Sequence, residues 1–121
     1  MGNLQENLPE GWYSKIEKSR EKSRKLLGKV IAVDLNTSVV VGKLEDVMLD
    51  KLFRLKYPFC KLTLSRAKRF SIDGKFESST DTDQVCFINK PSMLMDLDDF
   101  SKKFPKMYED VLVEIKRGRY D

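Results

Sequence analysis

The stretch from Gly28 to Phe70 constrains the fold of this chain more than any other part of the sequence. It opens with the apolar run GKVIAVDLNTSVVVGKLEDVML and closes with the basic run YPFCKLTLSRAKRF. The β-branched residues of 29–35 and 38–46 predict two strands, and the polar residues between them predict a tight turn. Gly42 lies inside the second strand and predicts a bulge or a sharp bend, which a strongly curved small barrel requires. The stretch therefore predicts a small barrel that presents cations to a polyanion.

The size and the charge of the chain set limits on its class. Its 121 residues predict one domain, and its 40% hydrophobic and 35% charged residues are typical of a folded domain with a heavily charged surface. Lys and Arg number 23 against 19 Asp and Glu, which gives a formal net charge of +4. Because this excess is mild, a role in binding nucleic acid has to depend on where the cations cluster.

Several kinds of chemistry have no support in the sequence. The chain has no His, which is the commonest general base and metal ligand. Cys60 and Cys86 cannot form a zinc site alone, and their apolar surroundings predict buried free thiols in a reducing compartment. There is no Gly-rich phosphate loop, no nucleophile–base pair and no apolar run near the ~20 residues of a membrane span. We therefore expect no enzyme activity, no cofactor, no metal site, no membrane partner and no small-molecule substrate.

The residues before Gly28 predict an arm followed by a charged helix. Residues 1–11 are polar and contain a proline and a glycine, so we expect a flexible or extended arm. Ser14 and Glu17 match a capping box, which predicts a helix that begins at Ser14 and ends at Gly28. Its alternating charges fit a solvated, salt-bridged face, and they fit phosphate contact equally well, because SREKSRK sets cations at helical spacing.

The residues that follow the apolar strand pair predict a third strand and a basic cluster. The apolar spacing of residues 47–56 allows either a helical turn or a continued strand. Residues 59–65 predict the third strand, and residues 65–70 form the densest basic cluster of the chain at its end. Clustered cations at a strand end indicate phosphate contact, and a solvated loop is the alternative.

The C-terminal part predicts a mixture of short elements. Asp73-Gly74 predicts a turn, and residues 77–84 predict an acidic loop that lacks the spacing of a calcium loop. Residues 85–88 predict a short buried strand. Residues 92–106 carry a helical apolar stripe that Pro105 ends. Residues 111–115 fit a last strand, or the end of a second short helix that begins near Met107.

Taken together, these segments resemble the small-subunit ribosomal protein S-seventeen family. The strand pair GKVIAVDLNTSVVV has the length and rhythm of that family's opening strands, with Thr37 in place of the expected lysine. VCFINKPS resembles the family's strand that leads into Arg-Pro-Leu-Ser, with Lys90 for the arginine. The run YPFCKLTLSRAKRF matches the family's basic stretch without a gap, at Pro58, Lys61, Arg66, Lys68, Arg69 and Phe70.

The resemblance implies a mainly β fold, with a five-stranded OB-type small barrel at residues 28–92. An N-terminal arm and charged helix at 1–27 would precede the barrel, and a helical C-terminal extension with a closing strand or tail would follow at 93–121. It implies a structural protein of the small ribosomal subunit, whose partners are small-subunit ribosomal RNA and neighbouring ribosomal proteins. The low net charge, the acidic loop and an insertion near 48–55 fit a divergent mitochondrial member. The implied RNA-binding residues are Lys29, Lys43, Lys61, Arg66, Lys68, Arg69 and Lys90, with Arg20 and Arg24 added from the charged helix.

A second interpretation of the same strands is an OB-type or Sm-like adaptor subunit of another nucleic-acid or protein complex. Both folds use the same short, bent strands. The apolar stripe of residues 93–104 would then be a helix that binds a partner. The sequence leaves both interpretations open.

Overall fold

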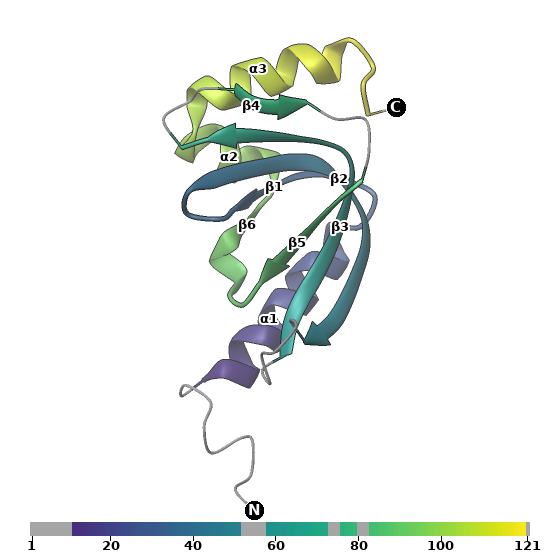
Figure 1. Ribbon diagram of the computed structural model, residues 1–121, viewed down its shortest axis with the longest axis vertical. Helices are drawn as coiled ribbons and strands as arrows, with labels where there is room; N and C mark the ends of the chain where they lie inside the picture. Colours follow the sequence, from purple (N-terminus) through teal and green to yellow (C-terminus); the bar gives the residue numbers. More distant parts are fainter. Residues whose placement is uncertain (1–10, 52–57, 73–75, 80–82, 121) are drawn as a thin grey trace, which may run out of the picture.

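The chain folds as a curved antiparallel sheet with helices against it (Figure 1). The computed structural model describes residues 11–51, 58–72, 76–79 and 83–120. Helix α1 precedes the strands, and α2 and α3 follow them, with the 3-10 helix η2 between the last two strands. The elements are α1 (Trp12–Lys25), β1 (Val30–Asp34), β2 (Ser38–Lys51), β3 (Pro58–Ser71), β4 (Phe76–Ser79), β5 (Gln84–Ile88), η2 (Pro91–Met93), β6 (Leu94–Met95), α2 (Leu97–Lys103) and α3 (Pro105–Lys116).

The sheet is open, which corrects the expected closed barrel. Its strand order is β4-β3-β2-β1-β6, and β5 pairs with another part of β3. In the described part of the chain, β4 and β5 pair only with β3, and β6 pairs only with β1, so no strand pair closes a barrel. The N-terminal helix and the helical C-terminal part are confirmed, and with three α-helices the fold is a mixed α/β one rather than a mainly β one.

The apolar strand pair is buried on both of its faces. Ile31, Val33 and Val40 belong to one core cluster, which also contains the inward residues of β3 and β5. Val39 and Val41 belong to a second cluster, in which residues of α2 and α3 cover the other face. Burial on both faces explains why these residues form nearly continuous apolar runs and do not alternate cleanly with polar ones.

The bulge that Gly42 predicts is confirmed. The pairing of β2 with β3 shifts at this glycine, where one residue of β2 lies opposite Arg66 and Ala67 of β3. Arg66 has a φ of 51°, the left-handed region that a non-glycine residue seldom adopts. A second register shift lies further along β2, between Leu44 and Asp46. The two irregularities bend the β2–β3 hairpin.

Replacing Gly42 by Ala is expected to lower the free energy of unfolding by about 1–3 kcal/mol, because it overpacks this crossing. A Cβ atom at Gly42 would lie 2.9 Å from the Ser65 carbonyl oxygen and 3.0 Å from the Leu64 Cβ atom. Urea denaturation measures the change, with Thr37→Ala at an exposed turn position as the control. A Gly42→Ala variant as stable as the wild type would contradict the close approach of β2 and β3.

The observed helix boundaries differ from the predicted ones at two places. The prediction that α1 begins with Ser14 as its N-cap is wrong, since the N-cap is Gly11, with a φ of 77° and no side-chain hydrogen bond. Pro105 begins α3 and does not simply end the preceding helix, because proline suits the first helical position. The segment 111–115, left open between strand and helix, lies in α3.

The strands are longer than predicted. The third strand continues through the basic cluster as far as Ser71, and β4 includes residues 77–79 of the expected acidic loop. The ambiguous segment that starts at Val47 continues β2 to Lys51. Cys60 and Cys86 are buried free thiols, as predicted. The predictions on residues 1–10, 52–57, 73–75 and 80–82 lie outside the described residues.

Candidate nucleic-acid interface

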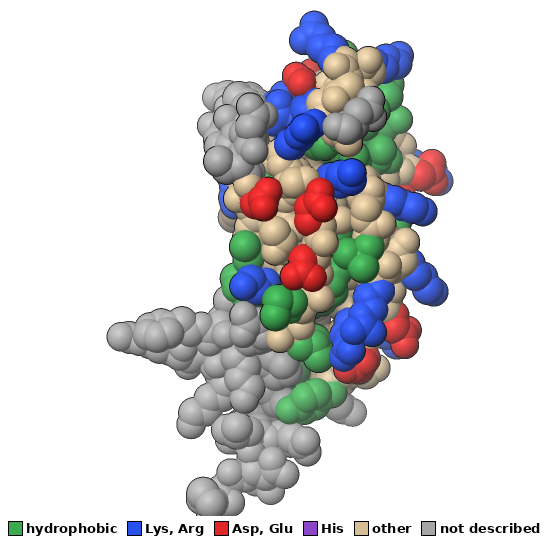
Figure 2. Space-filling view, turned by 90° about the vertical axis from the view of Figure 1, so that its right-hand side faces the viewer, with side chains coloured by type: hydrophobic (Ala, Val, Ile, Leu, Met, Phe, Trp, Pro, Cys, Tyr) green, Lys and Arg blue, Asp and Glu red, His purple; other side chains and the backbone are tan. Residues whose placement is uncertain are grey.

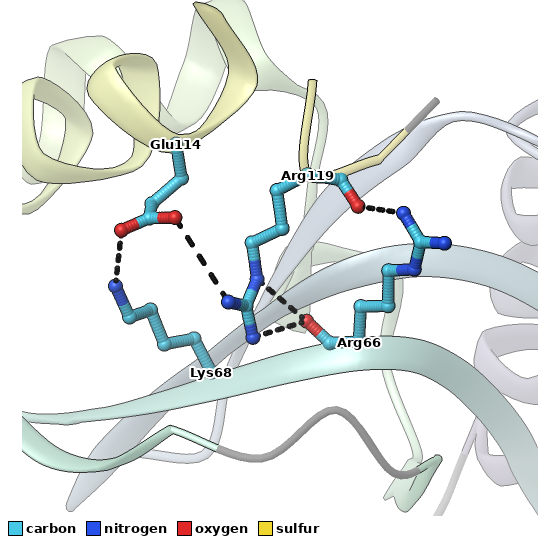
Figure 3. A network of polar contacts seen from close by, with 4 residues as sticks. All are labelled: Arg66, Lys68, Glu114 and Arg119. Carbon is cyan, nitrogen blue, oxygen red and sulfur yellow. Dashed lines mark hydrogen bonds and ion pairs between the residues drawn. The ribbon is translucent and has the colours of Figure 1, made fainter. Parts of the chain in front are cut away.

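The basic cluster of β3 is divided between two surroundings. Arg66 and Lys68 lie against α3 and the residues that follow it (Figure 3). Arg69 instead bonds to β2 and β5, through the Ser38 hydroxyl at 3.1 Å and the Gln84 side-chain oxygen at 3.5 Å. Cations that are neighbours in the sequence therefore do not form one continuous basic surface.

Arg66 and Lys68 both have partners from the C-terminal part of the chain. The Lys68 ammonium lies 3.2 Å from the Glu114 carboxylate, and these side chains are only 11% and 24% exposed. The Arg66 guanidinium donates to the Arg119 carbonyl oxygen. In return, the Arg119 guanidinium donates to the Arg66 carbonyl oxygen at 3.4 Å and lies 3.9 Å from Glu114 (Figure 3). An RNA phosphate at this place would have to replace these internal partners.

The Lys68–Glu114 pair makes stability depend on pH. The hydrogen bond from Lys68 holds the pKa of the Glu114 carboxyl below its usual range. A carboxyl with a depressed pKa stabilises the folded state at neutral pH, and this stabilisation is lost as the pH falls through the folded-state pKa.

Replacing Lys68 by Met is expected to lower the free energy of unfolding by about 0.5–1 kcal/mol at pH 7, since the pair is partly exposed. The difference from the wild type should shrink below pH 4.5, the ordinary pKa of this carboxyl, as Glu114 becomes protonated. Urea denaturation at several pH values measures both effects. The control is Lys102→Met, which removes the exposed ion pair with Asp98 on α2 and should change little at any pH. A pH-independent Lys68→Met difference would contradict the ion pair.

The excess positive charge of the chain lies on α1 and the turn after it. Residues 12–29 contain seven Lys or Arg and two Glu, a net charge of +5, whereas the whole chain carries +4. The rest of the chain is therefore close to neutral. A localised positive region of this kind is the electrostatic feature that marks nucleic-acid contact.

Four lysines of α1 lie on one side of the helix. Lys15, Lys18, Lys22 and Lys25 recur at intervals of three or four residues and so share one side of the helix. We name these four residues the lysine stripe. All of them are exposed except Lys22, which is half-buried.

Arg20 and Arg24 lie on the other exposed side of α1. Glu17 is there as well, and the Arg20 guanidinium lies 3.8 Å from its carboxylate, whereas Glu21 lies between the two cation sets, four positions before Lys25. Of the two cation sets on α1, the lysine stripe is therefore the better candidate for phosphate contact.

The lysine stripe runs beside the segment that contains Lys90. Lys22 donates to the carbonyl oxygens of Pro91 at 3.1 Å and of Leu94 at 2.5 Å, and α1 packs against η2. Lys90 directly precedes η2 and is exposed. This predicted RNA-binding residue thus lies close to the lysine stripe, although 65 positions separate Lys90 from Lys25 in the sequence.

A cleft of about 480 Å³ opens beside Lys90. Burial alone would raise the pKa of the Asp34 carboxyl there, but hydrogen bonds from Lys103 and from the Asn36 backbone N–H hold the pKa below its usual range. Lys103 approaches Asp34 to 2.7 Å. The cleft contains two ammonium groups, of Lys90 and Lys103, and one carboxylate, of Asp34, so its net charge is positive. It is lined by Asp34, Leu35, Asn36, Asn89, Lys90, Ser92, Met93 and Lys103.

Of the remaining predicted site residues, Lys29 and Lys43 lie on adjacent segments, since Val30 is the strand partner of Lys43, whereas Lys61 lies on β3. Lys29 is exposed between α1 and β1, whereas Lys43 on β2 and Lys61 on β3 are half-buried. Figure 2 shows one side of the molecule, with acidic side chains near its centre and Lys and Arg side chains scattered around them, at the top and along the right margin. The described side chains therefore form no continuous basic patch on this side. The site prediction had not included the lysine stripe, which the three-and-four spacing of its residues indicates, or Lys103, for which the sequence held no signal.

No protein-family model, curated protein or solved structure matches this chain. Within the described ranges, no helix is long and apolar enough to cross a membrane, and no three or more His, Cys, Asp or Glu side chains group as metal ligands. The function therefore has to be inferred from the charge, exposure and contacts of the chain itself.

Proposed function

We propose that this chain is a non-catalytic, RNA-binding adaptor subunit of a ribonucleoprotein complex. The observation that carries the proposal is the concentration of positive charge on residues 12–29, with a lysine stripe that lies beside Lys90. Lysine side chains neutralise phosphates and release the counterions that surround RNA, so they supply affinity without reading sequence. The cleft beside Lys90 provides a place for a neighbouring phosphate or sugar group next to the same surface.

The open sheet supports an adaptor of the Sm-like kind. Open strand edges allow a partner to add a strand, and main-chain hydrogen bonds then supply the affinity. A closed OB-type barrel would have no such edge. The resemblance to the S-seventeen family depends on three basic residues of β3, namely Arg66, Lys68 and Arg69. All three have internal partners, which makes them less suited to phosphate contact.

A second candidate is a structural protein of the small ribosomal subunit, in the mitochondrion, that binds small-subunit ribosomal RNA. It is favoured by the exposure of Lys90, which stands where the S-seventeen family has an arginine. On this alternative, neighbouring ribosomal proteins would be the partners, and the OB-type barrel would be completed by contacts in the particle.

Sedimentation of a cell extract at stepped salt concentrations distinguishes the two candidates. The adaptor proposal predicts that a tagged full-length chain sediments apart from small ribosomal subunits, in a smaller complex. RNase treatment should lower the sedimentation coefficient of this complex or release the chain from it. Sedimentation with small subunits at moderate salt would instead support the ribosomal candidate. A complex that RNase leaves unchanged would overturn RNA binding in both.

A further inference from the structure

Among the residues that the structure describes, none pairs with the outer edge of β5, and the strand has no charged residue. In the described part of the chain, β5 pairs with β3 alone, from Gln84 opposite Leu64 to Ile88 opposite Cys60. Its sequence QVCFI contains no Lys, Glu, Asp, Arg or Pro, and the Val85 side chain is 45% exposed. Monomeric proteins usually protect an edge strand with a charge, a proline, a bulge or a covering element. The absence of such protection indicates an edge that pairs with another chain.

The opposite end of the sheet is protected in the usual way. Helix α1 packs against β6, and Lys22 donates to the carbonyl oxygen of Leu94 at 2.5 Å. Strand β6 is also only two residues long, and both of its side chains are buried. A chain that added its β5 to the β6 of a neighbour would have to displace Lys22. Head-to-tail pairing, which would build a ring or a filament, is therefore disfavoured.

The residues of β5 complement a second copy of themselves. In an antiparallel pair centred on Cys86, Val85 of one copy lies opposite Phe87 of the other, and the same contact occurs twice. These residues share the outer face of the sheet with Lys61 and Thr63, their partners on β3. A β-branched residue opposite an aromatic residue is a favourable cross-strand pair. No like charges meet along the strand.

We propose that two copies of this chain form a symmetric dimer by antiparallel pairing of β5 with β5 of the second copy, centred on Cys86. The two sheets then join into one continuous sheet across a two-fold axis, as an isologous interface requires. Because α1 covers β6, pairing of β5 with the β6 of a further copy does not extend the assembly. The dimer goes beyond the proposed function, since it involves neither the lysine stripe nor RNA.

Light scattering coupled to gel filtration tests the dimer on the full-length chain without RNA. The wild type is expected to have twice the chain mass of 14.1 kDa, and to dissociate on dilution. Val85→Lys places an ammonium group opposite Phe87 of the second copy and should leave a folded monomer, with a dissociation constant raised at least tenfold. The control is Val113→Lys on α3, where the side chain is 48% exposed, and it should remain a dimer.

If one substitution does not separate the two copies, a mixture of two oppositely charged variants tests the same interface. Val85→Lys/Phe87→Lys and Val85→Glu/Phe87→Glu chains should each be monomers, because like charges lie opposite one another in a pair of identical copies. An equal mixture should recover the dimer through Lys–Glu pairs, and circular dichroism checks that each variant is folded. A wild type that is monomeric at every concentration, a larger ring, or a dimer that none of these changes affects would overturn the proposal.

Discussion

Replacing Lys15, Lys18 and Lys25 together by Gln is expected to lower the affinity for RNA on the order of 10–100-fold at about 0.1 M salt. All three lysines are exposed on one side of α1, so each can contact a phosphate without giving up an internal partner that the structure describes. Each lost phosphate contact should also reduce the slope of log K against log salt by about 0.7–0.9. Fluorescence anisotropy with a labelled RNA at several salt concentrations measures both quantities.

A matched variant separates local contact from net charge. Lys102, Lys106 and Lys116 are exposed on α2 and α3, and their replacement by Gln removes the same formal charge. This control should lose only the small affinity that long-range attraction supplies, and its salt slope should stay close to that of the wild type. Equal losses in the two triple variants would contradict a specific role for the lysine stripe.

Replacing Phe100 by Ala is expected to lower the free energy of unfolding by about 3–5 kcal/mol, the usual range for a fully buried aromatic residue. Phe100 has no exposed surface, and its ring lies 6.2 Å from that of Phe104 and 6.1 Å from that of Tyr108. It is the residue by which α2 enters the second core cluster, next to Met107 and Val111 of α3. Its loss removes the packing that holds both helices on the sheet.

Urea denaturation followed by circular dichroism measures this effect. Val113→Ala, at an exposed position of α3, is the control and should change the stability by no more than about 0.5 kcal/mol. If Phe100→Ala had the stability of the control, α2 and α3 would not be integral to the fold. They would then be an extension of a smaller domain that ends at residue 92, as predicted from the sequence.

The sequence predicts the first half of the sheet well because its signals are local. The β-branched runs, the polar turn near Asn36 and the glycine at position 42 each determine backbone geometry within a few residues. The end of the chain is different, because VLVEI is as suitable for a strand as for a helix. Only the packing of Met107 and Val111 in the second cluster, at helical spacing, decides for α3. That packing depends on strands far away in the sequence.

The candidate site was harder to predict for a related reason. A cation in a sequence does not reveal whether its partner is a phosphate or a distant acid of the same chain. Lys68 and Glu114 are separated by 46 positions, and only the fold brings them together. The lysine stripe was visible in the spacing of its residues on α1, whereas its closeness to Lys90 required the contact between Lys22 and Pro91.

Mapping of the RNA contact by NMR distinguishes the lysine stripe from the basic cluster of β3. A ¹⁵N-labelled chain would be titrated with a short single-stranded RNA at about 0.1 M salt, and the amide shifts of each residue would be followed. We expect the largest amide shifts on residues 15–25 and 89–92, and only small shifts on residues 66–69. Shifts concentrated on residues 66–69, with α1 unaffected, would contradict this expectation and would return the RNA contact to the basic cluster of β3.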